Sequence, residues 1–234
     1  MLISIQQPEF MPWMGYFDKI NNVDKVVFLD NVKFKKRYFE NRNKMRNKDS
    51  WIWLNVPVIS KGKFKQNINE VLIENANNWR DKITKTLKLN YSSTPYWNDV
   101  GPDFIDLIKS KWIKLIDLNI AIIQFFLNSF EINRPWVMAS DLKTKNFGSD
   151  LILEICQKTN ASHYLSGSFG KNYLNEEKFI SNNVNLAYQD FKHPEYSQIH
   201  NGFIHSMSIL DLYLNHGIEG KDLLASKNEI SKTR

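Results

Sequence analysis

Short apolar runs along the chain alternate with longer segments in which apolar residues recur every three or four positions. Short apolar runs bounded by polar or turn-forming residues are typical of buried strands. Such runs occur at 2–6, 25–29, 51–58, 68–73, 161–165 and 184–188. Pro57 has no backbone N–H to donate, so its segment is expected at an edge or at the end of a strand.

The longer segments have the spacing of amphipathic helices. In the clearest case apolar residues recur at every fourth position from Trp79 to Tyr91, which gives one apolar stripe on a helix. The same reasoning predicts helical segments at 15–21, 79–90, 104–116, 118–130, 149–157 and 206–216. Ser149 and Ser206 are the expected N-caps of the last two, and Gly217 is the expected C-terminal stop of the final helix.

Strands that alternate with helices are typical of α/β proteins. We therefore expect a mainly parallel sheet flanked by helices, a Rossmann-like three-layer sandwich with a helical middle segment. The sequence shows no internal repeat and no linker, which predicts a single domain over residues 1–217. Residues 218–234 are expected to form a polar C-terminal tail.

Composition narrows the class of protein. The chain has 234 residues, of which 42% are hydrophobic, and a single cysteine. This excludes a disulfide framework and a cysteine-rich zinc site. No apolar run reaches membrane-spanning length, because polar residues interrupt the most apolar stretch at 113–130. The first residues carry no basic leader of the kind found in signal peptides. We expect a soluble, cytoplasmic protein with no membrane span.

The positive charge is concentrated in one segment. Between Lys33 and Lys48 there are eight basic residues and one acidic residue, Glu40, so this segment carries +7 and the rest of the chain −1. A basic patch of this kind attracts a nucleotide, a phosphopantetheine arm, an acidic protein or a nucleic acid. The balanced remainder argues against nucleic acid. Arg37 and Arg42 suit bidentate contacts with phosphate; the alternative is a solvated basic loop.

Candidate chemistry lies where the first two predicted strands end. Ligands of parallel sheets bind beyond the carboxyl ends of the strands, and Gln7 and Asp30 follow those ends. Asp30 either binds a ligand or caps the following turn. Trp13 and Tyr16 flank a glycine, Gly15, which would let the backbone approach a ligand closely.

Two later segments add further candidates. The loop from Ser166 through Gly167 to Lys171 follows a predicted strand and is able to bind phosphate through backbone N–H groups, although its spacing is not that of a P-loop. His193 lies in a loop beside carboxylates and has the right pKa range to accept a proton from an amine. A simple loop and a structural histidine are the respective alternatives. No spacing of His or carboxylate residues marks a metal site, and no cofactor is assigned.

These segments together resemble the WbqC-like protein family over 3–217. The resemblance rests on Gln7-Pro8-x-x-x-Pro12-Trp13-x-Gly15-Tyr16-Phe17, Asp30, Lys36-Arg37, Asn41-Arg42-Asn43, Val56-Pro57-Val58, Tyr164-Leu165-Ser166-Gly167, Tyr173-Leu174, Phe191-x-His193-Pro194-x-Tyr196-x-Gln198 and Ser208-Ile209-Leu210-Asp211-x-x-x-Asn215-x-Gly217. Gln6 departs from the family pattern, in which His or Met is common at that position.

The resemblance implies a glycine, aminoacyl or other acyl transferase that acts on an amino group of a nucleotide-linked sugar in bacterial O-antigen or surface glycan biosynthesis. Its partners would be the nucleotide-linked amino sugar and an acyl-carrier protein or activated aminoacyl donor, without nucleic acid. We assign catalysis to His193, Asp30 and Gln7. We assign substrate binding to Trp13, Gly15, Tyr16, Lys36, Arg37, Asn41, Arg42, Asn43, Ser166, Gly167, Tyr173, Tyr196 and Gln198.

Two other functions remain open at this stage. One is a nucleotidylyl-transferase-like enzyme, because the turn at 12–16 occupies the place of the His-x-Gly-His turn of such folds, with Trp13 and Tyr16 in place of the histidines. The other is a non-catalytic protein of a glycan locus that binds a carrier or serves as a scaffold. An enzyme requires the N-terminal and C-terminal motifs to meet at one cavity.

Overall fold

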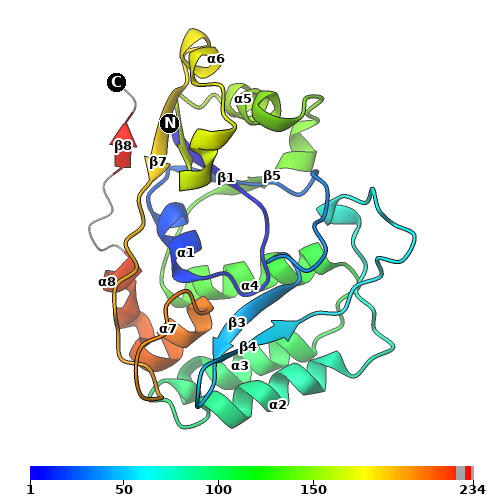
Figure 1. Ribbon diagram of the computed structural model, residues 1–234, viewed down its shortest axis with the longest axis vertical. Helices are drawn as coiled ribbons and strands as arrows, with labels where there is room; N and C mark the ends of the chain where they lie inside the picture. Colours follow the sequence, from blue (N-terminus) through cyan, green and yellow to red (C-terminus); the bar gives the residue numbers. More distant parts are fainter. Residues whose placement is uncertain (225–229, 233–234) are drawn as a thin grey trace.

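A computed structural model describes residues 1–224 and 230–232 of the chain. Its centre is a sheet in the order β5-β2-β1-β6-β7-β8, in which the first five strands are parallel and β8 is antiparallel (Figure 1). The strands are β1 (Leu2–Gln6), β2 (Lys25–Phe28), β5 (Trp136–Met138), β6 (His163–Ser166), β7 (Asn185–Gln189) and β8 (Ile230–Lys232). This arrangement confirms the predicted α/β fold.

The direction of the strand order reverses at β1. The chain places β2 on one side of β1, with Gln6 paired to Phe28, and returns much later to place β6 on the other side, with Ser4 paired to Leu165. The connections therefore leave the carboxyl ends of β1 and β6 in opposite directions. A crevice is expected at such a reversal.

Apolar cores lie on both faces of the sheet. Side chains alternate along a strand, and in β1 Ile3 and Ile5 belong to the core under α5 (Gly148–Lys158) and α6 (Glu176–Ser181). The opposite face packs against a larger core formed with α1 (Met14–Asn21), α4 (Leu115–Ser129), α7 (Ile209–His216) and α8 (Gly220–Leu224). These faces make the three layers of the predicted sandwich.

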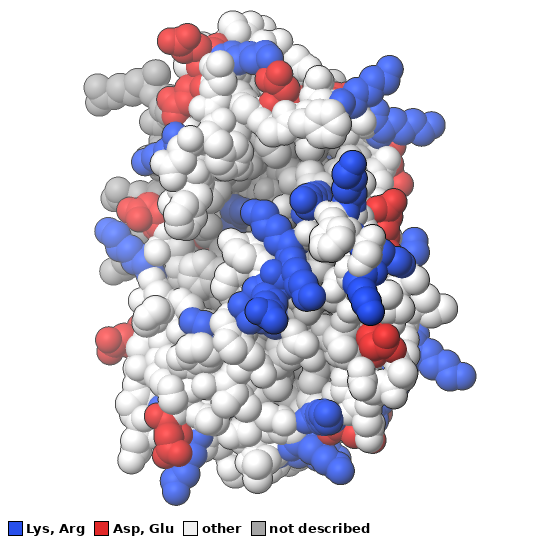
Figure 2. All heavy atoms as spheres, turned by 45° about the vertical axis from the view of Figure 1, so that its right-hand side comes forward, with Lys and Arg blue, Asp and Glu red and all other residues white. Residues whose placement is uncertain are grey.

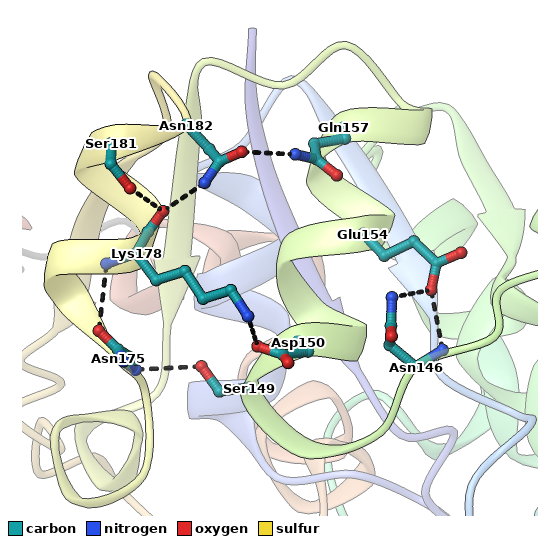
Figure 3. Close-up of polar contacts among 9 residues, drawn as sticks. All are labelled: Asn146, Ser149, Asp150, Glu154, Gln157, Asn175, Lys178, Ser181 and Asn182. Atoms are coloured by element: carbon teal, nitrogen blue, oxygen red, sulfur yellow. Dashed lines mark hydrogen bonds and ion pairs between the residues drawn. The ribbon is translucent and has the colours of Figure 1, made fainter.

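Polar contacts join α5 to α6 (Figure 3). The Lys178 ammonium pairs with the Asp150 carboxylate at 2.6 Å, and the Asn175 backbone N–H donates to Ser149 Oγ at 3.0 Å. Towards the other end of both helices, Gln157 Nε2 donates to Asn182 Oδ1 at 2.9 Å. Because α6 follows the connection that leaves β6, these contacts help to hold that connection in place.

The middle of the chain forms the lower part of Figure 1. It contains an antiparallel hairpin and two helices below the sheet, namely β3 (Arg42–Arg46), β4 (Trp51–Asn55), α2 (Trp79–Tyr91) and α3 (Trp97–Lys109). The apolar stripe predicted as one helix over 104–116 is divided between α3 and α4, with a break at 110–114. Within the described ranges 1–224 and 230–232, no helix combines the length and the apolar character that crossing a membrane requires.

Several local predictions are wrong for identifiable reasons. Residues 68–73 do not form a strand; they start with the short 3-10 helix η1 (Ile68–Glu70), because Asn67 and Glu70 cap each other. The N-cap of α7 is Ser208, whose Oγ accepts from the Leu210 N–H, and not Ser206. Phe147 and not Ser149 is the N-cap of α5.

The C-terminal segment begins in ordered structure. Gly217 ends α7 as predicted, with a φ of 59° that favours glycine. Residues 217–224 form the 3-10 helix η4 (Gly217–Glu219) and α8, and Leu224 is fully buried against the core. The parts of the predicted polar tail at 225–229 and 233–234 lie outside the described residues.

Candidate functional site

A cleft of about 720 Å³ lies at the carboxyl ends of β1 and β6, where the strand order reverses. Its walls come from the β1–α1 connection, the loop after β2, the hairpin, the loop after β6 and the end of β7. Eight of the residues assigned from the sequence line this cleft: Gln7, Trp13, Gly15, Tyr16, Asn43, Ser166, Gly167 and Tyr173. Segments far apart in the sequence therefore share one cavity.

Gln6 ends β1 inside the cleft. Its side chain is only 6% exposed, and neither its amide nitrogen nor its amide oxygen has a hydrogen-bond partner. A buried amide without partners is costly, and native proteins seldom leave both atoms unsatisfied. Gln6 therefore places a buried amide group without partners at the end of β1, beside the cleft.

Two ionisable residues of the cleft have strongly shifted pKa values. Burial raises the pKa of the Glu9 carboxyl to about 8, and the charge of Glu40 adds to this effect whereas Lys19 opposes it. Burial likewise lowers the pKa of the Lys19 ammonium to about 8, against the effect of Glu9. A carboxyl and an amine that both titrate near neutral pH are suited to proton transfer.

Buried asparagines hold the loop that carries Glu9. Asn119 Nδ2 donates to the Pro8 carbonyl at 3.0 Å, on one side of Glu9. Asn43 Nδ2 donates to the Phe10 carbonyl at 3.1 Å, on the other side. The backbone is thus fixed before and after position 9. Asn43 was assigned to substrate binding, but both of its amide hydrogens are donated to carbonyls of this loop.

Trp13 and Gly15 form one packing unit in the cleft wall. A Cβ atom at position 15 would lie 2.5 Å from the Trp13 indole. The indole also packs edge-to-face on Phe191, with 5.2 Å between ring centroids. The Trp13 backbone forms an isolated β-bridge with Ser208. The close approach that Gly15 permits is therefore to Trp13, and this packing brings the N-terminal and C-terminal motifs together.

His193 contacts Trp13, which lines the cleft, but His193 itself is not among the lining residues. The two rings stack with 6.2 Å between their centroids. Its Nδ1 faces the Pro194 carbonyl at 2.9 Å, and its Nε2 accepts from the Ser206 backbone N–H at 3.0 Å. Burial lowers the pKa of His193. Both ring nitrogens are engaged by the backbone, so this geometry supports the structural reading of His193.

Asp30 lies at the end of β2, outside this cleft and beside a separate hollow. It is 2% exposed. Its carboxylate accepts from the Ser140 N–H at 2.8 Å and from Ser140 Oγ at 2.6 Å, and also from Asn69 Nδ2 at 3.2 Å. These bonds fasten β2 to the neighbouring segments, which is the role of a turn-stabilising aspartate.

Tyr196 and Gln198 belong to a buried network around Asp211. Tyr196 Oη donates to the Asp211 carboxylate at 2.8 Å, Gln198 Nε2 donates at 2.9 Å and Tyr91 Oη at 2.7 Å. Burial raises the pKa of Asp211, although the three hydrogen bonds oppose the shift. The network joins α7 to α2 and to the C-terminal loop, so the structure places Tyr196 and Gln198 away from the cleft.

The basic segment divides into two groups. Lys35 and Lys44 line the cleft, whereas Lys36, Arg37 and Arg42 do not. The Arg42 guanidinium lies 4.2 Å from the centroid of the Trp53 ring. Asn41 is buried, and its Nδ2 donates to Asn55 Oδ1 and to the Val56 carbonyl. Figure 2 shows Lys and Arg side chains gathered across the middle of one face, beside a hollow.

The loop after β6 packs tightly against the strand it leaves. A Cβ atom at Gly170 would lie 2.0 Å from Ser166 Oγ, whereas the space around Gly167 is open. Ser166 is 1% exposed. Gly170 therefore allows the 3-10 helix η3 (Ser168–Asn172) to lie against the end of β6 and to form one wall of the cleft.

Comparison with known proteins identifies the family of the chain. Residues 7–223 match the WbqC-like protein family. The chain belongs to this family. It is also 28% identical over 224 residues to the uncharacterized protein Rv1507c of Mycobacterium tuberculosis, an alignment that covers 95% of this chain and 96% of that protein. No solved structure matches this WbqC-like protein significantly.

Glu9, Lys19 and Gln6 are among the cleft residues of this WbqC-like protein that were not assigned from the sequence. Glu9 lies at an unspecified position of the Gln-Pro motif, Lys19 lies on α1, and Gln6 was set aside as a departure from the family pattern. A lone carboxylate or lysine carries no local signal, because its pKa is set by burial among distant segments. In 1–224 and 230–232, the structure groups no three His, Cys, Asp or Glu residues in a way that suits a metal ion.

Proposed function

We propose that this WbqC-like protein transfers an acyl or aminoacyl group, such as glycyl, to the amino group of a nucleotide-linked sugar in surface glycan biosynthesis. The observation that carries the proposal is Glu9, a carboxyl group with a pKa of about 8 in a cleft that also contains Lys19. An amine must lose a proton when it attacks a carbonyl carbon, and a base with a pKa near the working pH serves this step best.

Proton transfer would proceed through Glu9. The lone pair of the sugar amine attacks the acyl carbon of an activated donor, a thioester or an acyl adenylate, and a C–N bond forms. The ionised Glu9 carboxylate accepts the proton that the nitrogen releases. The bond from the acyl carbon to the sulfur or phosphate oxygen of the donor then breaks, and the leaving group departs with its electron pair. Lys19 stabilises the ionised form of Glu9 by its nearby charge.

Other lining residues would bind the acceptor. Lys35 and Lys44 provide positive charge for a diphosphate. Trp13 and Tyr38 provide ring surfaces for a sugar or a base. The unpartnered amide of Gln6 would pair with a polar substituent of the sugar. In this assignment, the phosphate contacts come from the two cleft lysines in place of Lys36 and Arg37.

The loop at 166–170 would stabilise the tetrahedral intermediate. The acyl oxygen becomes negatively charged when the amine adds to the carbonyl carbon. Backbone N–H groups near Gly167 are the donors proposed for this oxyanion, and each donor of this kind contributes about 3 kcal/mol in known enzymes. Gly167 lines the cleft, and the space where its Cβ would lie is open, so substrate is able to approach this backbone.

The test is a direct assay for acyl transfer. Purified protein is incubated with nucleotide-linked amino sugars and with aminoacyl thioesters or adenylates, and mass spectrometry follows the sugar. We expect acylated sugar whose rate of formation rises with pH through about 8, as Glu9 ionises. Glu9→Gln should lower the rate at least ~100-fold. Asp103→Asn, an exposed carboxylate on α3, should leave it unchanged.

Two outcomes would contradict the proposal. One is the absence of acylated sugar with every donor, together with turnover of free nucleotide, which would favour nucleotidylyl transfer. The other is a Glu9→Gln variant with full activity, which would remove the proposed base from the mechanism.

A further inference from the structure

Three phenylalanine side chains that the fold leaves in solvent lie on separate loops. Phe64, Phe147 and Phe169 are 82%, 87% and 81% exposed. Each has a lysine within two residues in the sequence, namely Lys63 and Lys65, Lys145, and Lys171. Single exposed apolar side chains are common on protein surfaces. Here, however, three of them lie on loops that also carry lysines.

Contacts connect these loops to the carboxyl edge of the sheet. The Phe34 N–H donates to the Gln66 carbonyl at 3.1 Å, which joins the Phe64 loop to the loop after β2. Asn31 Nδ2 donates to Thr144 Oγ1 at 2.9 Å, which joins the Phe147 loop to that same loop. Phe169 lines the cleft together with Lys35 of the loop after β2. We call these four loops, 31–38, 60–66, 143–147 and 167–173, the rim.

The charge of the rim is of one sign. Its four loops contain ten Lys and Arg residues and no Asp or Glu. The chain as a whole carries +6, so the remainder carries −4. Residues 61–65, which include three of these lysines, are all exposed. Figure 2 shows basic side chains across this side of the molecule, with few acidic ones between them.

We propose that the rim binds the surface of an anionic lipid bilayer. Lysines attract the negative headgroups, and the phenylalanine tips insert at the boundary between headgroups and acyl chains. Binding at the surface requires no membrane-spanning helix. This inference does not depend on the proposed acyl transfer. The rim shares Lys35, Gly167 and Phe169 with the cleft, but Phe64 and Phe147, which are changed in the test below, lie outside it.

The separation of the aromatic tips favours lipid over an acidic protein. Protein partners bind through a contiguous patch in which aromatic residues fill pockets and exclude water. Here each tip lies on its own loop, with lysines near it in the sequence. A bilayer accepts separate tips, because each tip inserts on its own while the lysines near it remain at the headgroups.

The test measures cosedimentation of the full chain with lipid vesicles. The vesicles contain either phosphatidylcholine alone or phosphatidylcholine with about 30% phosphatidylglycerol. We expect binding to the anionic vesicles that weakens as salt is raised, and little binding to the neutral ones. Combined Lys61→Glu, Lys63→Glu and Lys65→Glu should lower the partition coefficient at least ~10-fold. Combined Phe64→Ser and Phe147→Ser should lower it by a similar factor.

Helix α2 supplies matched controls. Lys82, Lys85 and Lys88 are exposed there, and Leu89 is 85% exposed. Changing these three lysines to Glu alters the net charge by the same amount as the rim variant, and Leu89→Ser removes an equally exposed apolar side chain. Both should bind anionic vesicles within ~2-fold of the unchanged protein. Circular dichroism verifies that every variant is folded.

Three results would contradict binding of the rim to an anionic bilayer. Equal losses in the rim and α2 variants would show an effect of net charge and overturn the proposal, as would equal binding to neutral and anionic vesicles. Rim-dependent binding to an acidic protein or an oligonucleotide, without binding to anionic vesicles, would assign the rim to another class of partner and overturn it as well.

Discussion

The indole ring of Trp13 lies over the α-carbon of Gly15, so closely that a β-carbon at position 15 would stand 2.5 Å from the ring. The spacing Trp-x-Gly in the sequence is therefore a steric pair in the structure. The pair forms a wall of the cleft and contacts Phe191 from the C-terminal part of the chain.

Replacing Gly15 by Ala should displace the indole and destabilise the fold. Overpacking of a filled site costs about 1–3 kcal/mol, and we expect a loss of this size in the free energy of unfolding measured with urea. Gly167→Ala is the control, because no atom lies within 4 Å of the position that its Cβ would take. Equal stability of the Gly15→Ala variant and the unchanged protein would contradict this packing.

Gln6→Leu should make the protein more stable and less able to bind its substrate. Both amide atoms of Gln6 are buried without partners, and replacing them with an apolar side chain removes a cost of about 1–2 kcal/mol. Gln198→Leu should do the opposite, because the Gln198 amide donates to Asp211 and accepts from the Ile204 N–H. Urea unfolding distinguishes the two, and a destabilised Gln6→Leu variant would indicate that Gln6 has partners within the protein.

The Glu9–Lys19 pair should make stability depend on pH in two opposite ways. The folded-state pKa of Glu9 is raised from 4.5 to about 8, so its contribution to stability is present at low pH and lost as pH rises over this range. The pKa of Lys19 is lowered from 10.5 to about 8, so its contribution is lost as pH falls from above 10.5 towards 8. Glu9→Gln should flatten the acidic limb by about 1–3 kcal/mol, and Lys19→Met the alkaline limb. Unfolding free energies measured from pH 5 to 10 test this, and unchanged limbs would contradict the shifts.

Lysines that line the cleft should matter more for nucleotide binding than their neighbours in sequence. Lys35→Ala and Lys44→Ala remove charge from the cleft, and each should raise the dissociation constant of a nucleotide-linked sugar by ~10-fold. Lys36→Ala and Arg37→Ala remove charge outside it and should change that constant by less than ~2-fold. Calorimetry measures both sets. A larger effect for the second pair would return the phosphate site to those two residues.

The secondary structure was predictable where the hydrophobic pattern within a segment indicates the element on its own. The strands β1, β2 and β6 are apolar runs, and α2 has a complete apolar stripe, so local sequence was sufficient for each. The strand β5 has only three residues and no alternation, and it pairs with β2 through contacts made across more than a hundred positions. The strand β3 reads as a basic loop because alternate residues, such as Arg42 and Lys44, face away from the core.

The site was predictable only in its location. Gln7, Trp13 and Ser166, which were chosen because they follow predicted strands, line one cavity in the structure. Position at the end of a strand did not distinguish residues that face the cavity from those that hold the chain in place. Asp30 and Tyr196 have polar groups of the expected kind, but the fold uses them in buried hydrogen bonds. Whether a polar residue faces the cavity or forms a buried hydrogen bond depends on which residues from distant segments lie next to it. The local sequence does not determine those neighbours.

The two asparagines that hold the Pro8 and Phe10 carbonyls, Asn119 and Asn43, donate their amide hydrogens only to main-chain oxygen. The side chain at position 9 contributes nothing to those bonds, so a mutation there leaves its α-carbon where it was. Residues with an amide, a hydroxyl or a carboxyl side chain are therefore able to replace one another at position 9 without a change in the backbone. Relatives with identical architecture and different chemistry would be the expected result.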